Sequence, residues 1–257
     1  MVPKSPKAHL RLASVHMLMK NDNAANESAK RALALEPNNV QARLAMIDLS
    51  LRRGDTDEAL TAARKLQKDS PSSPVAFLVE GDILLGQKKP ELAVRAYEQA
   101  YTLGKSAQLL VKFTQTQRML GKTKEADARL AAFLKDNPGE PLATMYSAET
   151  LMAAKQFKPA IAQFEIMLKS NPDNVVALNN LAWAYQQDKD QRALPTAEKA
   201  FKLAPQNPAV ADTLAWILIE KGDTKRAIPV LEQALSRAPE ANDLRYHLAF
   251  GFTQSRG

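Results

Sequence analysis

The chain has 257 residues, a formal net charge of +7 and no cysteine. Without cysteine it forms no disulfide framework, no thiolate metal site and no cysteine nucleophile. Hydrophobic residues make up 45% and charged residues 25%, which is typical of a soluble chain that buries a core. No apolar run approaches the roughly 18 residues of a membrane span. The positive charge suggests nucleic acid or an anionic membrane as a partner. Whether either fits depends on where the charges lie in the fold.

The sequence repeats with a period of 33 or 34 residues. The position that closes each unit is occupied by Pro37, Pro71, Lys105, Pro138, Pro172, Pro205 and Pro239. Twelve residues before each closing position there is an alanine, at Ala25, Ala59, Ala93, Ala126, Ala160, Ala193 and Ala227. Apolar residues three and four apart, as in Ala227, Leu231 and Ala234, indicate an amphipathic helix, and a proline cannot continue it. The pattern predicts seven units of two short helices, with a small residue where the two helices approach.

These features resemble the tetratricopeptide repeat family. Its 34-residue helix-turn-helix unit has large and small residues paired in the first helix, alanine opening the second helix and proline at its end. The resemblance covers residues 6–257 and implies an all-α fold, a right-handed superhelical solenoid. We expect repeats at 6–39, 40–73, 74–106, 107–140, 141–174, 175–207 and 208–241, with a partial repeat at 242–257. Because helices of about 14 residues are marginal alone, stacking should make the array a single cooperative solenoid.

Some positions depart from the repeat pattern. Repeat 3 has Leu103-Gly104-Lys105 in place of the closing proline, and repeat 6 is one residue short around residues 187–190. Pro195 and Pro229 are expected about five residues into second helices, where each should remove one backbone hydrogen bond and bend the helix slightly.

Residues 242–254 continue the first-helix pattern through Leu244, Leu248, Ala249 and Phe252, but the matching second helix is missing. Two interpretations stay open. Either the chain is a fragment of a longer array, or this helix caps the solenoid. An exposed apolar stripe here would also favour self-association through residues 242–257.

No pattern for catalysis, a cofactor or a metal stands out. Gly121-Lys122-Thr123 looks like the end of a phosphate-binding loop, but Thr116 stands where that loop needs glycine and no strand precedes it, so a turn is predicted. A metal shared by His9 and His16 lacks a further ligand at helical spacing, which favours histidines packed at an interface. We therefore expect no enzyme activity, no cofactor and no metal.

In tetratricopeptide arrays the first helices line a concave groove, and the resemblance implies that repeat positions 2, 5, 6, 9, 12 and 13 face it. The charged residues at these positions are Lys7, Arg11, Arg52, Lys112, Arg118, Asp48, Asp82, Glu149, Asp212, Glu220 and Asp243. A nucleic-acid groove would instead concentrate lysine and arginine among stacking aromatics. Nucleic acid is therefore not expected as a partner, and the excess charge is assigned to a solvated outer face.

Aromatic and polar side chains gather at the groove positions of the last repeats. Position 9 holds Trp183, Trp216 and Phe250, which form an expected aromatic row among hydrogen-bonding side chains. Such a mixture is typical of a binding surface. The tryptophans are alternatively packed sideways between first helices, and both roles are compatible because tryptophan is rarely fully buried. The predicted partner-binding residues are Trp183, Trp216, Asn179, Asn180, Asp212, Tyr246, Phe250 and Glu149. A protein or peptide partner is expected in the groove, with polysaccharide as the alternative ligand.

A narrower resemblance rests on the runs Leu178-Asn179-Asn180-Leu181-Ala182-Trp183 and Asp212-Thr213-Leu214-Ala215-Trp216. They resemble the C-terminal repeats of bacterial tetratricopeptide lipoproteins of exopolysaccharide export and the PEP-CTERM exosortase system. This resemblance covers residues 175–250 and implies a periplasmic protein that meets a membrane only through a lipid anchor outside this chain. The lipobox cysteine of those proteins is absent, as expected if the sequence omits that end of the protein. A cytoplasmic location is the alternative.

Overall fold

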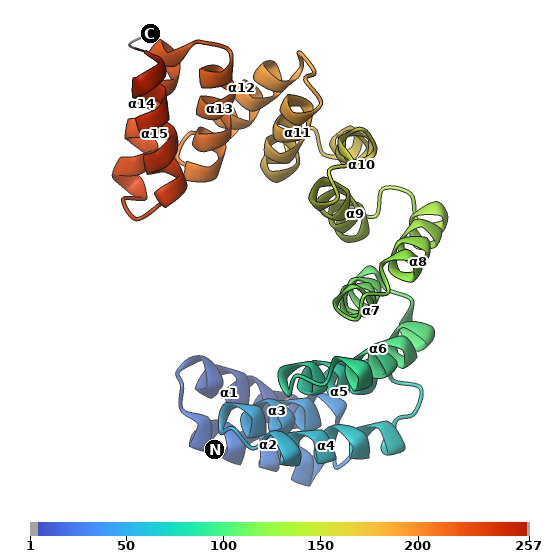
Figure 1. The fold of residues 1–257 in the computed structure, drawn as a ribbon. Helices are drawn as coiled ribbons and strands as arrows, with labels where there is room; N and C mark the ends of the chain where they lie inside the picture. The colour runs from blue at the N-terminus through green and yellow to red at the C-terminus, as the bar shows by residue number, and fades with distance from the viewer. Residues whose placement is uncertain (1–4, 256–257) are drawn as a thin grey trace. The chain divides into compact units, whose positions relative to one another are not determined.

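The structure is a computed structural model that describes residues 5–255. Within these residues it contains fifteen α-helices and no strand, which confirms the all-α fold class (Figure 1). The chain divides between Ala131 and Ala132, inside helix α8 (Thr123–Asp136), into two compact units. We call the part before this point unit 1 and the part after it unit 2.

Each expected repeat contains two helices. The helices of unit 1 before α8 are α1 (Pro6–Leu18), α2 (Asp22–Leu35), α3 (Val40–Arg52), α4 (Thr56–Asp69), α5 (Pro74–Gly86), α6 (Pro90–Gly104) and α7 (Ala107–Met119). Those of unit 2 after α8 are α9 (Pro141–Ala153), α10 (Phe157–Ser170), α11 (Val175–Gln187), α12 (Ala193–Leu203), α13 (Pro208–Glu220), α14 (Thr224–Arg237) and α15 (Asn242–Gln254). Odd-numbered helices are therefore first helices, and even-numbered ones are second helices.

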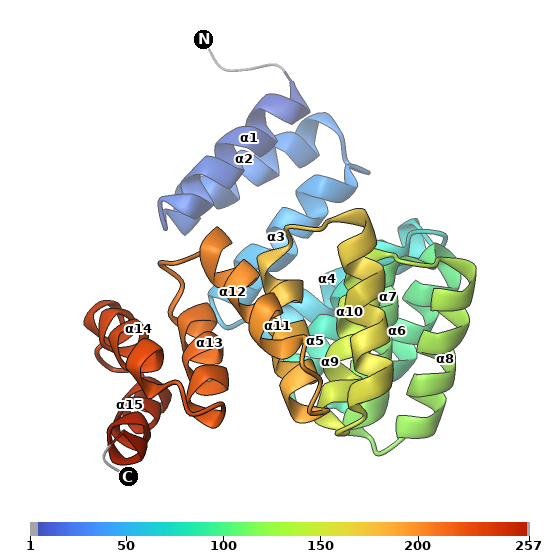
Figure 2. The same ribbon diagram turned by 90° about the horizontal axis from the view of Figure 1, so that it is seen from above.

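From α1 to α7, and again from α9 to α15, each helix packs against the next one in sequence, and some first helices also contact one another. Helix α1 lies along α2 (Figure 2), and α13 packs against α14. Helix α13 also contacts α11 on one side and α15 on the other. Because α11, α13 and α15 contact in order, side chains from three different repeats share one surface of unit 2.

The recurring alanines lie where the second helix of each repeat meets its neighbours. All seven alanines have 0% solvent exposure: Ala25, Ala59, Ala93, Ala126, Ala160, Ala193 and Ala227. A larger side chain in such close-packed surroundings would force the helices apart. This confirms the prediction of a small residue at the close approach.

The turn between the two helices of a repeat contains one residue in the left-handed conformation. Its occupants are Lys20, Gly54, Lys88, Gly121, Lys155, Lys189 and Gly222. In repeat 2, the N–H of Gly54 donates to the Leu51 carbonyl at 3.0 Å, and that of Asp55 donates to the Ser50 carbonyl at 2.9 Å. This is the Schellman arrangement, which satisfies carbonyls at the end of the helix. The prediction that Gly121-Lys122-Thr123 is a turn is confirmed.

The closing prolines follow the last residues of the second helices. Proline disfavours the helical conformation in the residue before it, so α4 ends with Ser70 in a non-helical conformation next to Pro71. Repeat 3 lacks this proline. Its second helix α6 runs on to Gly104 and ends with Lys105 in the left-handed conformation, at φ 39°.

The expectation for Pro195 is wrong, whereas Pro229 does lie inside its helix. Helix α12 begins at Ala193, so Pro195 is its third residue. The first N–H groups of a helix have no helical acceptor, and a proline there removes no bond. Pro229 lies in the interior of α14, where its missing N–H leaves one carbonyl of the preceding turn without its helical donor.

Helix α15 buries part of its expected apolar stripe. Leu244 is 3% exposed, and Leu248 packs against the core of unit 2. Phe252 stays 40% exposed. Within residues 5–255, no helix is long and apolar enough to cross a membrane.

Candidate functional site

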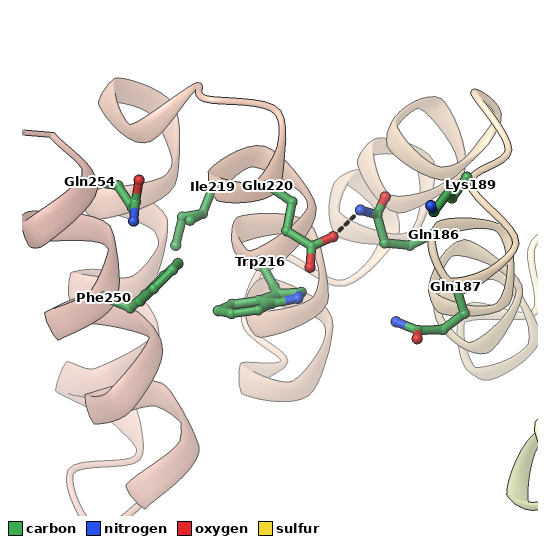
Figure 3. A pocket seen from close by; sticks show the side chains of 8 residues that line it. All are labelled: Gln186, Gln187, Lys189, Trp216, Ile219, Glu220, Phe250 and Gln254. Carbon is green, nitrogen blue, oxygen red and sulfur yellow. Dashed lines mark hydrogen bonds between the residues drawn. The ribbon is translucent and has the colours of Figure 1, made fainter. Parts of the chain in front are cut away.

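Two adjoining hollows lie on the surface that the first helices of unit 2 form, which we call the binding face. The first hollow has a volume of about 380 Å³ and is lined by Glu149, Met152, Phe164, Asn179, Asn180, Trp183 and Thr213. The second has a volume of about 580 Å³ and is lined by Gln186, Gln187, Lys189, Trp216, Ile219, Glu220, Phe250 and Gln254 (Figure 3). Trp183 and Gln186 are one turn apart on α11, so the two hollows follow one another along that helix.

The linings agree with the positions that the family resemblance implies. Every residue that lines either hollow occupies repeat position 5, 6, 9, 12 or 13, except Phe164 and Lys189. Helices α9, α11, α13 and α15 supply these side chains because residues three and four apart share one face of a helix. The register of the repeat thus determines which side chains line the hollows.

The structure divides the expected aromatic row into two groups. The Trp216 ring lies 4.4 Å from the His247 ring and 5.5 Å from the Phe250 ring, measured between centroids. Tyr246 stacks on Phe250 at 6.4 Å with 18° between the ring planes. The ring contact of Trp183 is instead with Phe157, the first residue of α10, edge-on at 6.0 Å.

Trp183 is packed on one side and exposed on the other, and its packing partner belongs to a second helix and not to a neighbouring first helix. Its indole packs against Phe157, yet 39% of the residue is exposed at the first hollow. Trp216 is less exposed because His247 and Phe250 cover part of its ring, and the remainder lines the second hollow.

Hydrogen bonds fix several polar groups of the binding face. Asp212 lies 2.6 Å from Nδ1 of His247, which places that imidazole over Trp216. The Gln186 side-chain amide donates to the Glu220 carboxylate across the second hollow (Figure 3). The Oδ1 atom of Asn179 is shielded from solvent and has no hydrogen-bond partner among the described residues.

Six of the eight predicted partner-binding residues line a hollow. Glu149, Asn179, Asn180 and Trp183 line the first, and Trp216 and Phe250 line the second. Asp212 and Tyr246 line neither, but they contact the aromatic group of the second hollow through His247 and Phe250.

Sequence reasoning missed the glutamines of the second hollow and the partner of Trp183. Gln186, Gln187 and Gln254 occupy positions 12 and 13 of their repeats, where only charged residues were sought. Phe157 lies outside the groove positions, so the repeat pattern contained no signal for it. Ile219 lines the second hollow although it is only 4% exposed and belongs to the core.

The chemistry of the face is that of recognition through shape, aromatic surface and hydrogen-bond acceptors. Carboxylates and side-chain amides stand beside aromatic rings, a combination found where a few polar groups orient a bound molecule on apolar walls. His9 lies elsewhere, buried in α1 at 3% exposure. Within residues 5–255, no three histidine, aspartate or glutamate side chains lie close enough together to hold a metal ion.

Comparisons with known proteins identify the repeat. Two family models described as tetratricopeptide repeat match this chain, one at residues 184–249 and the other at residues 21–74 and 148–208. A tetratricopeptide-repeat-containing protein of Pseudomonas aeruginosa is 27% identical over 215 residues, which are 80% of this chain and 30% of that protein. This chain thus spans less than a third of the length of that relative.

Two solved structures show the same fold at low identity. Yeast Tom70 matches with a TM-score of 0.65 and 17% identity, over 97% of this chain and 53% of that one. YrrB, described as a tetratricopeptide repeat protein with an unusual peptide-binding site, matches with a TM-score of 0.51 and 18% identity, over 72% of this chain and 96% of that one. Because the family models together match more than half of the chain and their repeats coincide with its helix pairs, the chain belongs to the tetratricopeptide repeat family.

Proposed function

We propose that this chain is a scaffold without catalytic activity, and that its binding face holds an extended or helical segment of a partner protein. Tetratricopeptide repeat proteins are commonly interaction scaffolds that bind protein or peptide partners and are generally not catalytic. The observation that carries the proposal is the pair of adjoining hollows, each with a tryptophan in its lining. The peptide-binding site named for YrrB, which shares the fold, adds support.

The two tryptophans are the expected anchors of the bound segment. Partly exposed tryptophans in a preformed hollow lose little conformational freedom on binding and bury a large apolar area. Truncating such an anchor at an interface typically costs about 2 kcal/mol or more, equivalent to roughly thirtyfold in affinity.

Partner capture by tryptophan variants tests this proposal. The Trp183→Ala/Trp216→Ala variant should capture at least about tenfold less partner from an extract of the source cell than the unmodified chain does. The Phe252→Ala variant is the matched control. It removes a similarly exposed aromatic ring from the side of α15 that faces away from Phe250. Capture that stays unchanged in the double variant, with unchanged far-ultraviolet circular dichroism, would contradict the proposed site.

Carbohydrate binding is the second candidate, and the lining of the second hollow favours it. Trp216 offers an apolar ring, and Gln186, Gln187, Gln254 and Glu220 surround it with groups that hydrogen-bond hydroxyls. Titration with exopolysaccharide oligomers, followed by tryptophan emission, separates the two candidates. Saturable quenching by oligomers at millimolar concentration or below supports carbohydrate, whereas no response leaves the peptide proposal in place.

For the cellular context, we propose a periplasmic scaffold of bacterial exopolysaccharide export or protein sorting, held at the membrane by a lipid anchor outside this chain. The resemblance of residues 175–250 to such lipoproteins supports this context. Expression of the whole gene with its own upstream sequence, followed by protease treatment of intact spheroplasts, tests it. A protein that is digested only after the spheroplasts are lysed would contradict a periplasmic location.

A further inference from the structure

The charged residues at the groove positions differ in sign between the two units. All five basic ones, Lys7, Arg11, Arg52, Lys112 and Arg118, lie in unit 1. Both acidic residues at the groove positions of unit 1 form an ion pair with a basic side chain. Arg52 contacts Asp48 at 3.1 Å, and Lys112 contacts Asp82 at 2.8 Å. The groove positions of unit 2 contain Glu149, Asp212, Glu220 and Asp243, with no lysine or arginine.

Within unit 2, no lysine or arginine of the described residues forms an ion pair with these four acidic residues. Asp212 contacts His247, and Glu220 accepts from the uncharged amide of Gln186. Glu149 and Asp243 are exposed and have no ion-pair partner among the described residues of unit 2. One cation, Lys189, does line the second hollow, at the turn that follows α11. Even with Lys189 included, the acidic residues of the binding face outnumber the basic ones.

The hydrogen-bonding groups of the binding face favour the same kind of partner as its charge does. The four carboxylates only accept hydrogen bonds. A partner that supplies N–H donors and positive charge satisfies these groups, whereas a carboxylate placed here would meet like charge. The two hollows meanwhile require apolar side chains beside those donors.

From this complementarity we infer that the segment held by the binding face is basic, with lysine or arginine side chains interspersed with aromatic or long aliphatic anchors. The inference rests on the proposed function and names the chemistry of its partner. The anchors enter the two hollows beside Trp183 and Trp216. The basic side chains lie against Glu149 and Asp243 at the rim and against Asp212 and Glu220 nearer the centre.

A peptide selection against the full chain tests this inference directly. Random twelve-residue peptides displayed on phage are selected on the immobilised chain, and each enriched peptide is retested on the Trp183→Ala/Trp216→Ala variant. The enriched peptides that depend on the tryptophans should have a positive mean net charge and at least one aromatic or long aliphatic residue.

The affinities of these peptides provide a second readout, measured by fluorescence anisotropy. Glu149→Gln/Asp243→Asn should weaken binding of a basic peptide about fivefold in low salt, because each exposed charge pair contributes modestly. About 0.5 M salt should remove most of that difference. The matched control is Asp136→Asn/Glu232→Gln, which removes the same charge from exposed positions on second helices and should leave the affinity within twofold.

The possible results separate this inference from the proposed function. Peptides that depend on the tryptophans but are neutral or acidic overturn the basic partner and leave the site in place. Equal weakening by the rim variant and its control also overturns it, since only total charge would then matter. If no enriched peptide depends on the tryptophans, both the site and the inference are wrong.

Discussion

At the scale of single residues, the turn inside each repeat imposes a left-handed backbone that only some residues adopt without strain. Gly54 has φ of 85°, and a Cβ added there meets no atom within 4 Å. Any cost of an alanine at this position is therefore backbone strain alone. The same kind of turn contains Lys88, at φ 59°, so strain is tolerated in other repeats.

This geometry predicts opposite effects for two glycines. Gly54→Ala should lower the free energy of unfolding by about 1 kcal/mol, because alanine is disfavoured at positive φ. Gly86, the last residue of α5, also has free space around an added Cβ but is not at positive φ. Gly86→Ala should raise stability by up to about 1 kcal/mol. Urea unfolding measures both, and a stabilising Gly54→Ala would contradict this account of the turn.

The sequence predicted these turns where glycine marks them and not where lysine does. The turn at Gly121 was predicted, and Gly54 and Gly222 have the same left-handed conformation at the matching place of repeats 2 and 7, where glycine often ends a helix. Lysine carries no such signal, and the left-handed Lys20 and Lys155 follow from the period of the repeat and not from their own preference. The position of a residue within the repeat therefore predicts the left-handed turn better than the residue's own conformational preference does.

At the scale of helices, α5 and α6 show how the two helices of one repeat pack against each other. The Tyr97 ring of α6 lies so close to Gly81 of α5 that a Cβ on Gly81 would be 2.5 Å from it. The Tyr97 hydroxyl donates to Asp82 at 2.6 Å. Burial of the ring, and then the hydrogen bond to the Asp82 carboxylate, raise the pKa of Tyr97 well above its ordinary value near 10.

This raised pKa predicts a loss of stability in alkali. The unfolded chain releases the tyrosine proton near pH 10 while the folded chain retains it, so stability is full below pH 10 and falls as pH rises above it. Tyr97→Phe should cost about 1 kcal/mol at neutral pH through the lost hydrogen bond and make the alkaline decline shallower. Tyr185 shares the effect, because burial and its hydrogen bond to Glu165 raise its pKa too. Urea unfolding between pH 7 and 11 measures this.

Tyr246→Phe serves as the control for that experiment, because its ring is 63% exposed. Its alkaline decline should match that of the unmodified chain. An equal flattening in Tyr246→Phe and Tyr97→Phe would contradict the assignment to buried tyrosines.

The sequence predicted the helix pairs well and their exact ends less well. The contact of Gly81 with Tyr97 was not predicted, because the repeat pattern does not specify which ring fills the space beside a small residue. Pro195 was misplaced because the shortened repeat 6 delays the start of α12 to Ala193. A proline is disruptive only after the first turn, so a short shift of the helix start reverses its effect.

At the scale of the whole molecule, the expectation of a single cooperative solenoid stays a prediction that unfolding experiments test. Both tryptophans of the chain, Trp183 and Trp216, lie in unit 2, whereas helices of both units contribute to circular dichroism. If stacking couples all repeats, urea unfolding curves from tryptophan emission and from far-ultraviolet circular dichroism coincide. Curves with different midpoints would show that the units unfold separately.

The candidate site was predictable in its location but not in its detail. The period of the repeat and the family resemblance identified the groove positions, so six predicted residues line the hollows. The pairing of Trp183 with Phe157, and of Asp212 with His247, depends on how side chains from different repeats meet. A pattern of single positions does not contain that information.

Tryptophan emission during binding tests the central claim most directly. Because the two tryptophans of the chain both line the binding face, any change in emission or in acrylamide quenching reports on that face. Saturation with the captured partner should shift the emission to shorter wavelength and protect it from acrylamide, and Trp183→Phe and Trp216→Phe should each retain part of the change. Saturated binding that leaves both emission and quenching unchanged would show that the partner lies elsewhere on the molecule.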